Sequence, residues 1–145
     1  MKLTVYSDYT LRVLMYLALH RDQLSTIPEI AAAYDISENH LMKVVHQLGK
    51  SGMVESVRGK GGGVRLAMEP DQIRVGRVVR DAEGEAPIVE CFSEHNNCRI
   101  APSCRLAKVL SDGFDALYAS LDQYTLADLV ARPAAMTRQL RITAA

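Results

Sequence analysis

The sequence lacks any long apolar segment. No apolar run approaches the roughly 18 residues that a membrane-spanning helix needs. Near the N-terminus, Asp8 and Arg12 interrupt what would be the apolar core of a signal peptide. We therefore expect a cytoplasmic protein with no membrane partner.

The sequence also lacks the residue patterns of common enzymes. It has no Cys-x-x-Cys pair, no glycine-rich nucleotide-binding pattern after a predicted strand, and no nucleophile–base pair. Residues 59–61 read Gly-Lys-Gly, but the Gly-Lys-Ser/Thr ending of a P-loop is absent. We therefore expect a protein that catalyses no reaction.

Net charge is absent as well, because 17 Lys and Arg residues balance 17 Asp and Glu residues. The charges are unevenly distributed: residues 1–80 hold eleven basic and eight acidic side chains, whereas residues 81–145 hold six and nine. A basic front half suits an anionic partner. The length of 145 residues fits one domain, or a small domain with an appended dimerisation element.

Periodicity and capping signals predict helices in the front half. Residues 7–20 place apolar side chains at three- and four-residue spacing, which covers one face of a helix. Thr26 and Glu29 form a capping box for a short second helix that ends near Tyr34. Ser37 is a good cap for a third, more polar helix at 38–51.

A basic hairpin is predicted to follow the third helix. Two β-prone runs, 54–57 and 64–66, flank a tip that is rich in glycine, lysine and arginine. A short helix at 75–81 completes this unit, which spans residues 1–82. Two short helices, a polar third helix and a basic hairpin, in that order, are typical of a winged helix-turn-helix DNA-binding domain.

In such a domain the third helix enters the major groove and the hairpin, or wing, reaches the DNA backbone or the minor groove. Side chains suited to reading base edges are Asn39, His40, Lys43 and Gln47. Side chains suited to neutralising phosphates are Lys50, Arg58, Lys60 and Arg65. The alternative is that these polar residues only solvate an exposed helix face, but their combination with the basic wing favours DNA binding.

All three cysteines of the chain, Cys91, Cys98 and Cys104, lie in a polar loop at residues 83–104. An odd number of cysteines in a reducing compartment argues against a disulfide framework. Thiolates gathered on a short loop are soft ligands suited to zinc or to an iron–sulfur cluster. The alternative is that the three cysteines are unrelated buried side chains that bind no metal. His95 could complete a zinc site, although the spacing matches no common zinc finger.

A long amphipathic helix is predicted after the cysteine loop. Residues 103–123 carry an apolar stripe on a helix of about twenty residues, roughly 30 Å long. One small domain offers too little cover for this stripe, so we expect it to pair with a second subunit in a homodimer. Thr125 caps a last short helix at 126–131, which completes a segment at 105–132. Pro133 is predicted to end that helix, leaving a flexible tail at 133–145.

Taken together, these motifs resemble the iron–sulfur winged-helix repressors of the Rrf family, and within it the nitric-oxide-sensing members. The resemblance rests on residues 1–9, the helix at 37–48, the basic wing at 58–63 and the Cys91-x6-Cys98-x5-Cys104 spacing. These features span nearly the whole chain short of the tail. The fold class implied is mainly α, with a winged helix-turn-helix domain and a long C-terminal dimerisation helix.

The resemblance implies that the cysteines hold an iron–sulfur cluster, with 4Fe–4S favoured and 2Fe–2S possible. It also implies that an acidic residue on the first helix of the partner subunit supplies the fourth ligand, and Asp8 matches that position. A branch of the family that controls cluster assembly uses a histidine where this chain has Ala107. Taken by itself, Asp8 is also a helix-capping residue or an i,i+4 partner of Arg12.

The function implied is transcriptional repression. The cluster-loaded dimer would bind an inverted-repeat DNA operator, and nitrosylation of the cluster by nitric oxide would release it. Two alternatives remain open: a redox or iron-status sensing regulator on the same scaffold, and a zinc-stabilised DNA-binding module.

Overall fold

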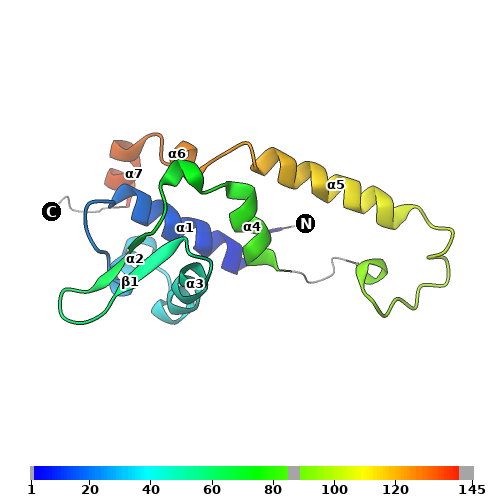
Figure 1. Cartoon of the computed structure of the whole chain (residues 1–145), viewed down its shortest axis with the longest axis horizontal. Coiled ribbons are helices and arrows are strands. Elements are labelled where there is room, and N and C mark those ends of the chain that lie inside the picture. Colours follow the sequence, from blue (N-terminus) through cyan, green and yellow to red (C-terminus); the bar gives the residue numbers. More distant parts are fainter. Residues whose placement is uncertain (1, 85–88, 141–145) are drawn as a thin grey trace.

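The computed structural model describes residues 2–84 and 89–140. The helices and strands follow in the order α1 (Val5–Leu19), α2 (Ile27–Tyr34), α3 (Glu38–Lys50), β1 (Val54–Val57), β2 (Gly63–Leu66), η1 (Pro70–Gln72), α4 (Val75–Glu83), η2 (Glu90–Phe92), α5 (Leu106–Leu121), α6 (Leu126–Leu129) and α7 (Pro133–Gln139). Figure 1 shows that α5 extends away from the body formed by the other helices and the hairpin, with the cysteine loop at its far end.

The helix starts follow from local capping chemistry. Thr4 caps α1 by accepting a hydrogen bond from the Ser7 backbone nitrogen at 3.1 Å. The predicted capping box of α2 is confirmed, because Thr26 and Glu29 make both reciprocal bonds. Ser37 occupies the N-cap position of α3, but its side chain makes no capping hydrogen bond. The prediction of that helix was therefore right in position, and wrong in the contact expected to start it.

The core lies where α1, α2 and α3 meet the hairpin and α4. Fully buried side chains include Leu14 of α1, Ile30 of α2 and Leu41 of α3. Leu126 of α6 is buried in the same core, and its backbone nitrogen donates to the Ile73 carbonyl oxygen at 2.9 Å. The chain therefore returns after α5 to complete the front unit, which the sequence pattern did not indicate.

The hairpin is an antiparallel pair of strands with Val54 opposite Leu66 and Val57 opposite Gly63. Beside it, Ser25 forms an isolated bridge with Val64, joined by hydrogen bonds of 3.0 and 2.7 Å. A Cβ atom at Gly63 would lie 2.7 Å from the Ser25 carbonyl oxygen, so glycine is needed for this close approach. The bridge fixes the wing to the turn that precedes α2.

The long helix is anchored at its C-terminal end. Arg80 of α4 binds both carboxylate oxygens of Asp122, and its guanidinium lies 4.7 Å from the centre of the Tyr118 ring. A Cβ atom at Gly76 would lie 2.7 Å from Asp122 Cγ, so the two segments touch directly. None of the residues of α5 is buried in this subunit.

The structure corrects the sequence prediction at several element ends. The long helix covers 16 residues and begins at Leu106, because Ser103 and Cys104 lie in turns rather than in the helix. Pro133 does not end the chain's regular structure but opens α7, since proline is tolerated in the first turn of a helix. The last five residues of the predicted tail lie outside the described residues. No helix in the described part of the chain is long and apolar enough to span a membrane.

Candidate functional site

The face of α3 that points away from the core carries Asn39 and Lys43 of the predicted base-reading side chains, whereas His40 and Gln47 lie on the side toward α1. Leu41, Val44 and Leu48 are buried on the inner face. Helical periodicity places Asn39, Lys43 and Lys50 on the opposite side. The predicted DNA-contacting residues of α3 are all exposed: Asn39, His40, Lys43, Gln47 and Lys50.

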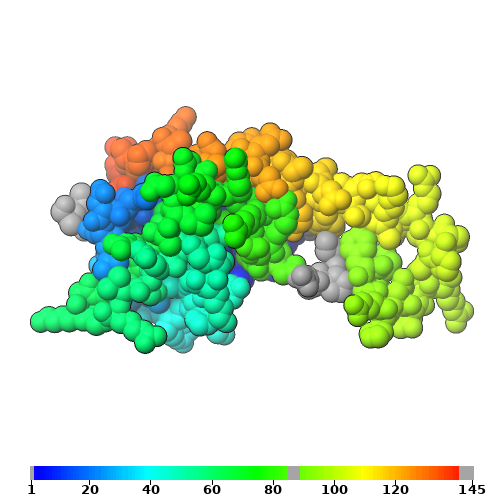
Figure 2. All heavy atoms as spheres, in the orientation of Figure 1, coloured from blue at the N-terminus to red at the C-terminus, as the bar shows by residue number. Residues whose placement is uncertain are grey.

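The wing adds exposed basic side chains beside this helix. Arg58 and Lys60 are exposed between the strands, and Figure 2 shows the hairpin projecting from the body. Arg65 is also exposed, but it forms an ion pair with Glu55, the residue opposite it in the hairpin. The hairpin register thus gives the predicted phosphate-binding Arg65 an intramolecular partner.

The cysteine loop joins α4 to α5. Cys91 lies in η2 and Cys104 two residues before α5, both half-buried, whereas Cys98 is exposed. All are free thiols. Within residues 2–84 and 89–140, no three His, Cys, Asp or Glu side chains converge as a metal site. The three predicted cysteine ligands are therefore present on one loop, but within the described part of this subunit they are not drawn together.

The chemistry of this loop nevertheless suits a cluster. The Leu106 backbone N–H donates to Cys104 Sγ at 3.4 Å, a contact of the kind that stabilises and tunes metal-bound thiolates. Glu90 and Asn96 accept hydrogen bonds from the backbone N–H groups of Asn97 and Cys98 at 3.0 and 2.8 Å, which shapes the exposed turn. The donor set fits a soft metal centre.

Asp8 lies in the first turn of α1. Its carboxylate pairs with Arg12 at 2.8 Å, which is the i,i+4 contact that the sequence also allowed. The side chain keeps 48% of its surface exposed, so it remains accessible to a second ligand. Figure 1 shows the N-terminal end of α1 on the side of the body from which the cysteine loop extends.

Glu83, the last residue of α4, contacts the start of α1, and the sequence patterns did not reveal this contact. Its Oε1 atom accepts hydrogen bonds from the Thr4 backbone nitrogen at 2.8 Å, from Thr4 Oγ1 at 3.0 Å and from the Ser7 hydroxyl. Burial raises the pKa of Glu83, but these hydrogen bonds outweigh it and hold the pKa below its usual value. One local signal existed. Ser7 occupies the position at which a capping box carries an acidic residue, so the N-cap Thr4 lacks a local acceptor for its backbone N–H.

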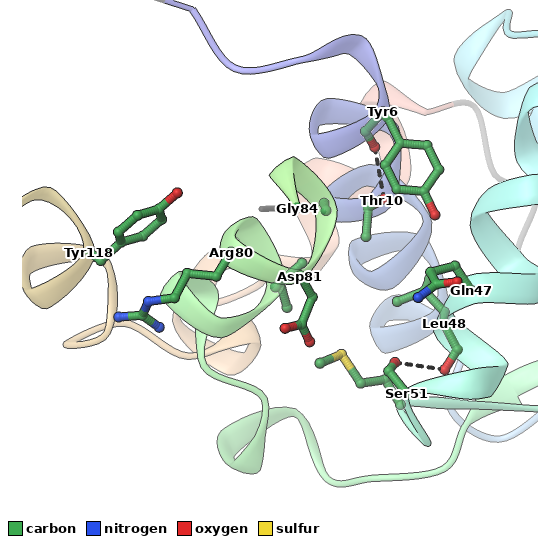
Figure 3. Close-up of a pocket in the computed structure, with 12 residues that line it drawn as sticks. Tyr6, Thr10, Gln47, Leu48, Ser51, Arg80, Asp81, Gly84 and Tyr118 are labelled. Carbon is green, nitrogen blue, oxygen red and sulfur yellow. Dashed lines mark hydrogen bonds between the residues drawn. The ribbon is translucent and has the colours of Figure 1, made fainter. Parts of the chain in front are cut away.

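A cleft of about 550 Å³ lies among α1, α3, α4 and α5. Tyr6 of α1, Gln47 of α3, Asp81 of α4 and Tyr118 of α5 line it, and Figure 3 shows the Tyr6 hydroxyl directed toward Gln47. The predicted recognition helix therefore faces both α1 and α4 across a partly open space.

An exposed polar helix beside a basic hairpin, packed on a small helical core, defines a winged-helix DNA-binding regulator. Residues 3–132 match the Rrf2 family, described as "Iron-dependent Transcriptional regulator", and the chain belongs to this family. The chain is 54% identical over 132 residues to the HTH-type transcriptional regulator NsrR of Bacillus subtilis (strain 168), a match that covers 90% of each chain.

Solved structures of other regulators share this fold. T. potens IscR superposes with a TM-score of 0.73 at 28% identity, covering 90% of this chain and 87% of that one. CymR, the global cysteine regulator of B. subtilis, superposes with a TM-score of 0.69 at 28% identity, covering 90% and 97%. The predicted family resemblance and fold class are thereby confirmed. The relatives are named as transcriptional regulators, which confirms the expectation of a regulator rather than an enzyme.

Proposed function

We propose that the chain is a homodimeric repressor that binds an inverted-repeat DNA operator and senses nitric oxide through an iron–sulfur cluster on the cysteine loop. The observation that carries this proposal is that both ends of the cysteine loop are tied to the DNA-binding unit. The loop leaves α4 directly after the Glu83 contacts, and it returns through α5, which Arg80 anchors on α4 through Asp122. A change in the loop therefore acts on the domain that holds α3.

Cys91, Cys98 and Cys104 would hold the cluster. A 4Fe–4S cluster is favoured because three thiolates and one carboxylate suit it, and 2Fe–2S is the alternative. When bound, the cluster supplies iron atoms that react with nitric oxide. The protein holds the thiolates in a loop with few buried contacts, so a change in ligation alters the loop at little cost to the core.

The exposed apolar side chains favour a second subunit. Leu106 and Val109 of α5 keep 53% and 61% of their surface exposed, and Val5 at the start of α1 keeps 58%. Apolar surface of this extent on a long helix is typical of an interface. In the proposed dimer, Asp8 of the partner subunit would be the fourth ligand, as the family resemblance implies.

The contact between Asp8 and Arg12 is a weak obstacle to this ligation. An exposed i,i+4 ion pair is worth about 0.3–0.5 kcal/mol, which is small beside a metal–ligand bond. A carboxylate is also a hard ligand for iron beside thiolates, so it is readily displaced. Asp8 is therefore suited to leave the metal when the signal arrives.

The DNA contacts follow from the exposed surfaces. Asn39, His40, Lys43 and Gln47 would read base edges in the major groove, and Lys50, Arg58, Lys60 and Arg65 would neutralise phosphates. Arg65 would exchange Glu55 for a phosphate. That exchange costs little, because a solvent-exposed pair contributes roughly 0.2–1 kcal/mol.

The decisive experiment measures iron and acid-labile sulfide in protein purified without oxygen, together with DNA binding before and after nitric oxide. Operator DNA is first selected from a random library. We expect near-equal iron and sulfide, close to four or two per chain, and loss of operator binding after nitric oxide. Zinc, or no metal after anaerobic reconstitution, would refute the sensor and leave a DNA-binding regulator. Release by peroxide or oxygen, but not by nitric oxide at equal dose, would favour the redox-sensing alternative.

A further inference from the structure

The carboxylate of Glu83 links two segments that are far apart in the sequence. Glu83 is the last residue of α4, and the first cysteine of the loop follows eight positions later. Thr4 and Ser7, which donate to the same Oε1 atom, lie four positions and one position before Asp8. The base of the cysteine loop is thus bonded to the turn that carries the proposed fourth ligand.

The geometry of this link fixes the first turn of α1. Thr4 is the N-cap of α1, and its carbonyl oxygen accepts the Asp8 backbone N–H at 3.2 Å. The Ser7 side chain is fully buried, so it has little freedom to find another partner. Because Glu83 accepts from the Thr4 backbone nitrogen as well as from both hydroxyls, moving the Glu83 carboxylate moves the cap and Asp8 with it.

From α1 the contact continues to α3. Tyr9, the residue after Asp8, has its ring centre 6.0 Å from the ring centre of His40 on the predicted recognition helix. Tyr6 and Gln47 line the same cleft. A chain of direct contacts therefore runs from the base of the cysteine loop through Glu83 and the start of α1 to α3. Packed side chains and hydrogen-bond networks carry energetic coupling between distant sites, and these residues form such a network.

We propose that Glu83 is a positioning residue that transmits the state of the cysteine loop to the DNA-binding helix by fixing the start of α1. The inference rests on the proposed function, because it concerns how cluster loading changes DNA affinity. Glu83 holds no metal in this scheme. Its role is to make the orientation of Asp8 and of α3 depend on the position of the loop of its own subunit.

The test compares the full-length dimer with Glu83→Ala, Glu83→Gln and a matched control, Asp128→Ala. Asp128 accepts hydrogen bonds from the backbone nitrogen and hydroxyl of Thr125 at 2.7 and 2.9 Å, so it makes the same kind of contact away from the loop. For each protein, the operator dissociation constant is measured with and without the cluster, and iron content is recorded. The quantity of interest is the dissociation constant without the cluster divided by the dissociation constant with it.

Allosteric couplings usually change affinity by about 5–150-fold. We expect Glu83→Ala to retain iron but to lower the ratio at least about fivefold, because the loop no longer holds the start of α1. Glu83→Gln should restore part of the ratio, since its amide oxygen can accept the same hydrogen bonds. Asp128→Ala should leave the ratio unchanged.

A wild-type ratio in Glu83→Ala would overturn the inference, and so would an equal loss of affinity in both states, which indicates a structural role alone. If Glu83→Ala does not fold, Ser7→Ala removes one of the bonds and should lower the ratio partly; an unchanged ratio there would refute the link. A ratio near one in the wild-type protein would instead refute the proposed function, and with it the need for a transmitting residue.

Discussion

The contact between α4 and α5 is tested by Gly76→Ala. Gly76 is buried, and a Cβ atom there would lie 2.7 Å from Asp122 Cγ and 3.0 Å from the Asp122 backbone nitrogen. Real Cβ atoms do not approach other atoms so closely, so Asp122 must move. Moving it breaks the bidentate bond to Arg80, which also packs on Tyr118.

The magnitude follows from opposing terms. Alanine in a helix is favoured over glycine by about 1 kcal/mol. Overpacking costs about 1–3 kcal/mol, and loss of an exposed ion pair adds up to about 1 kcal/mol. The balance lies between about zero and a net destabilisation of about 3 kcal/mol.

Urea unfolding of the cluster-free protein, at one protein concentration, measures this balance. The matched control is Gly49→Ala in α3, where the nearest atom to the new Cβ, the Val54 carbonyl oxygen, is 3.9 Å away. There only the propensity gain remains, so we expect a stabilisation of up to about 1 kcal/mol. If Gly76→Ala were as stabilising as Gly49→Ala, α5 would not be seated on α4 as described.

Three further changes test the site and its supports. Lys60→Ala should weaken binding to all DNA sequences and reduce the magnitude of the slope of log affinity against log salt by about one. Asn39→Ala should relax sequence preference and leave that slope unchanged. Titrations at several salt concentrations separate the two variants, and equal slopes for Lys60→Ala and wild type would contradict the wing contact. Asp8→Ala should lose its cluster to a chelator at least about tenfold faster, since even indirect partners of metal ligands change affinity 10–100-fold; unchanged absorbance decay and nitric-oxide response would exclude Asp8 as a ligand. Because the pKa of Glu83 is lowered in the folded state, its contribution to stability is present above the usual glutamate pKa of 4.5 and is lost as pH falls through the lower folded-state pKa. The difference in stability between wild type and Glu83→Gln should therefore shrink in acid. A difference that grows in acid would contradict the assignment.

Much of the fold was predictable because its signals are local. The capping box of Thr26 with Glu29 forms as predicted, and Thr125 caps the last helix as predicted, where Asp128, three residues on, completes a second box. The strand at 54–57 is also as predicted, and α2 keeps its expected end at Tyr34. Hydrophobic periodicity and capping residues are sufficient for such elements, because the interactions that decide them lie within one or two turns.

Contacts between distant segments were not predictable in the same way. Glu83 is separated from Thr4 by 79 positions, and the sequence around either residue does not indicate the other as its hydrogen-bond partner. The role of Leu126 is similar: its apolar character fits the end of a dimerisation element as well as the core of the front unit, and only the packing against Ile73 decides. One-dimensional patterns give the face of a helix that is buried, but not the segment that buries it.

The proposed cysteine site differs from both cases, because its formation would require more than the fold of one chain. The close spacing of Cys91, Cys98 and Cys104 along the chain is enough to predict a set of soft ligands. The fold of one subunit nevertheless leaves these thiols partly or fully exposed and not drawn together in the described part of the chain. In the proposed site, metal binding would supply the free energy that gathers these ligands, and the partner subunit would supply the remaining donor. A site that depends on metal and partner is therefore free to disassemble while the domain core stays folded, which is the property that a sensor requires.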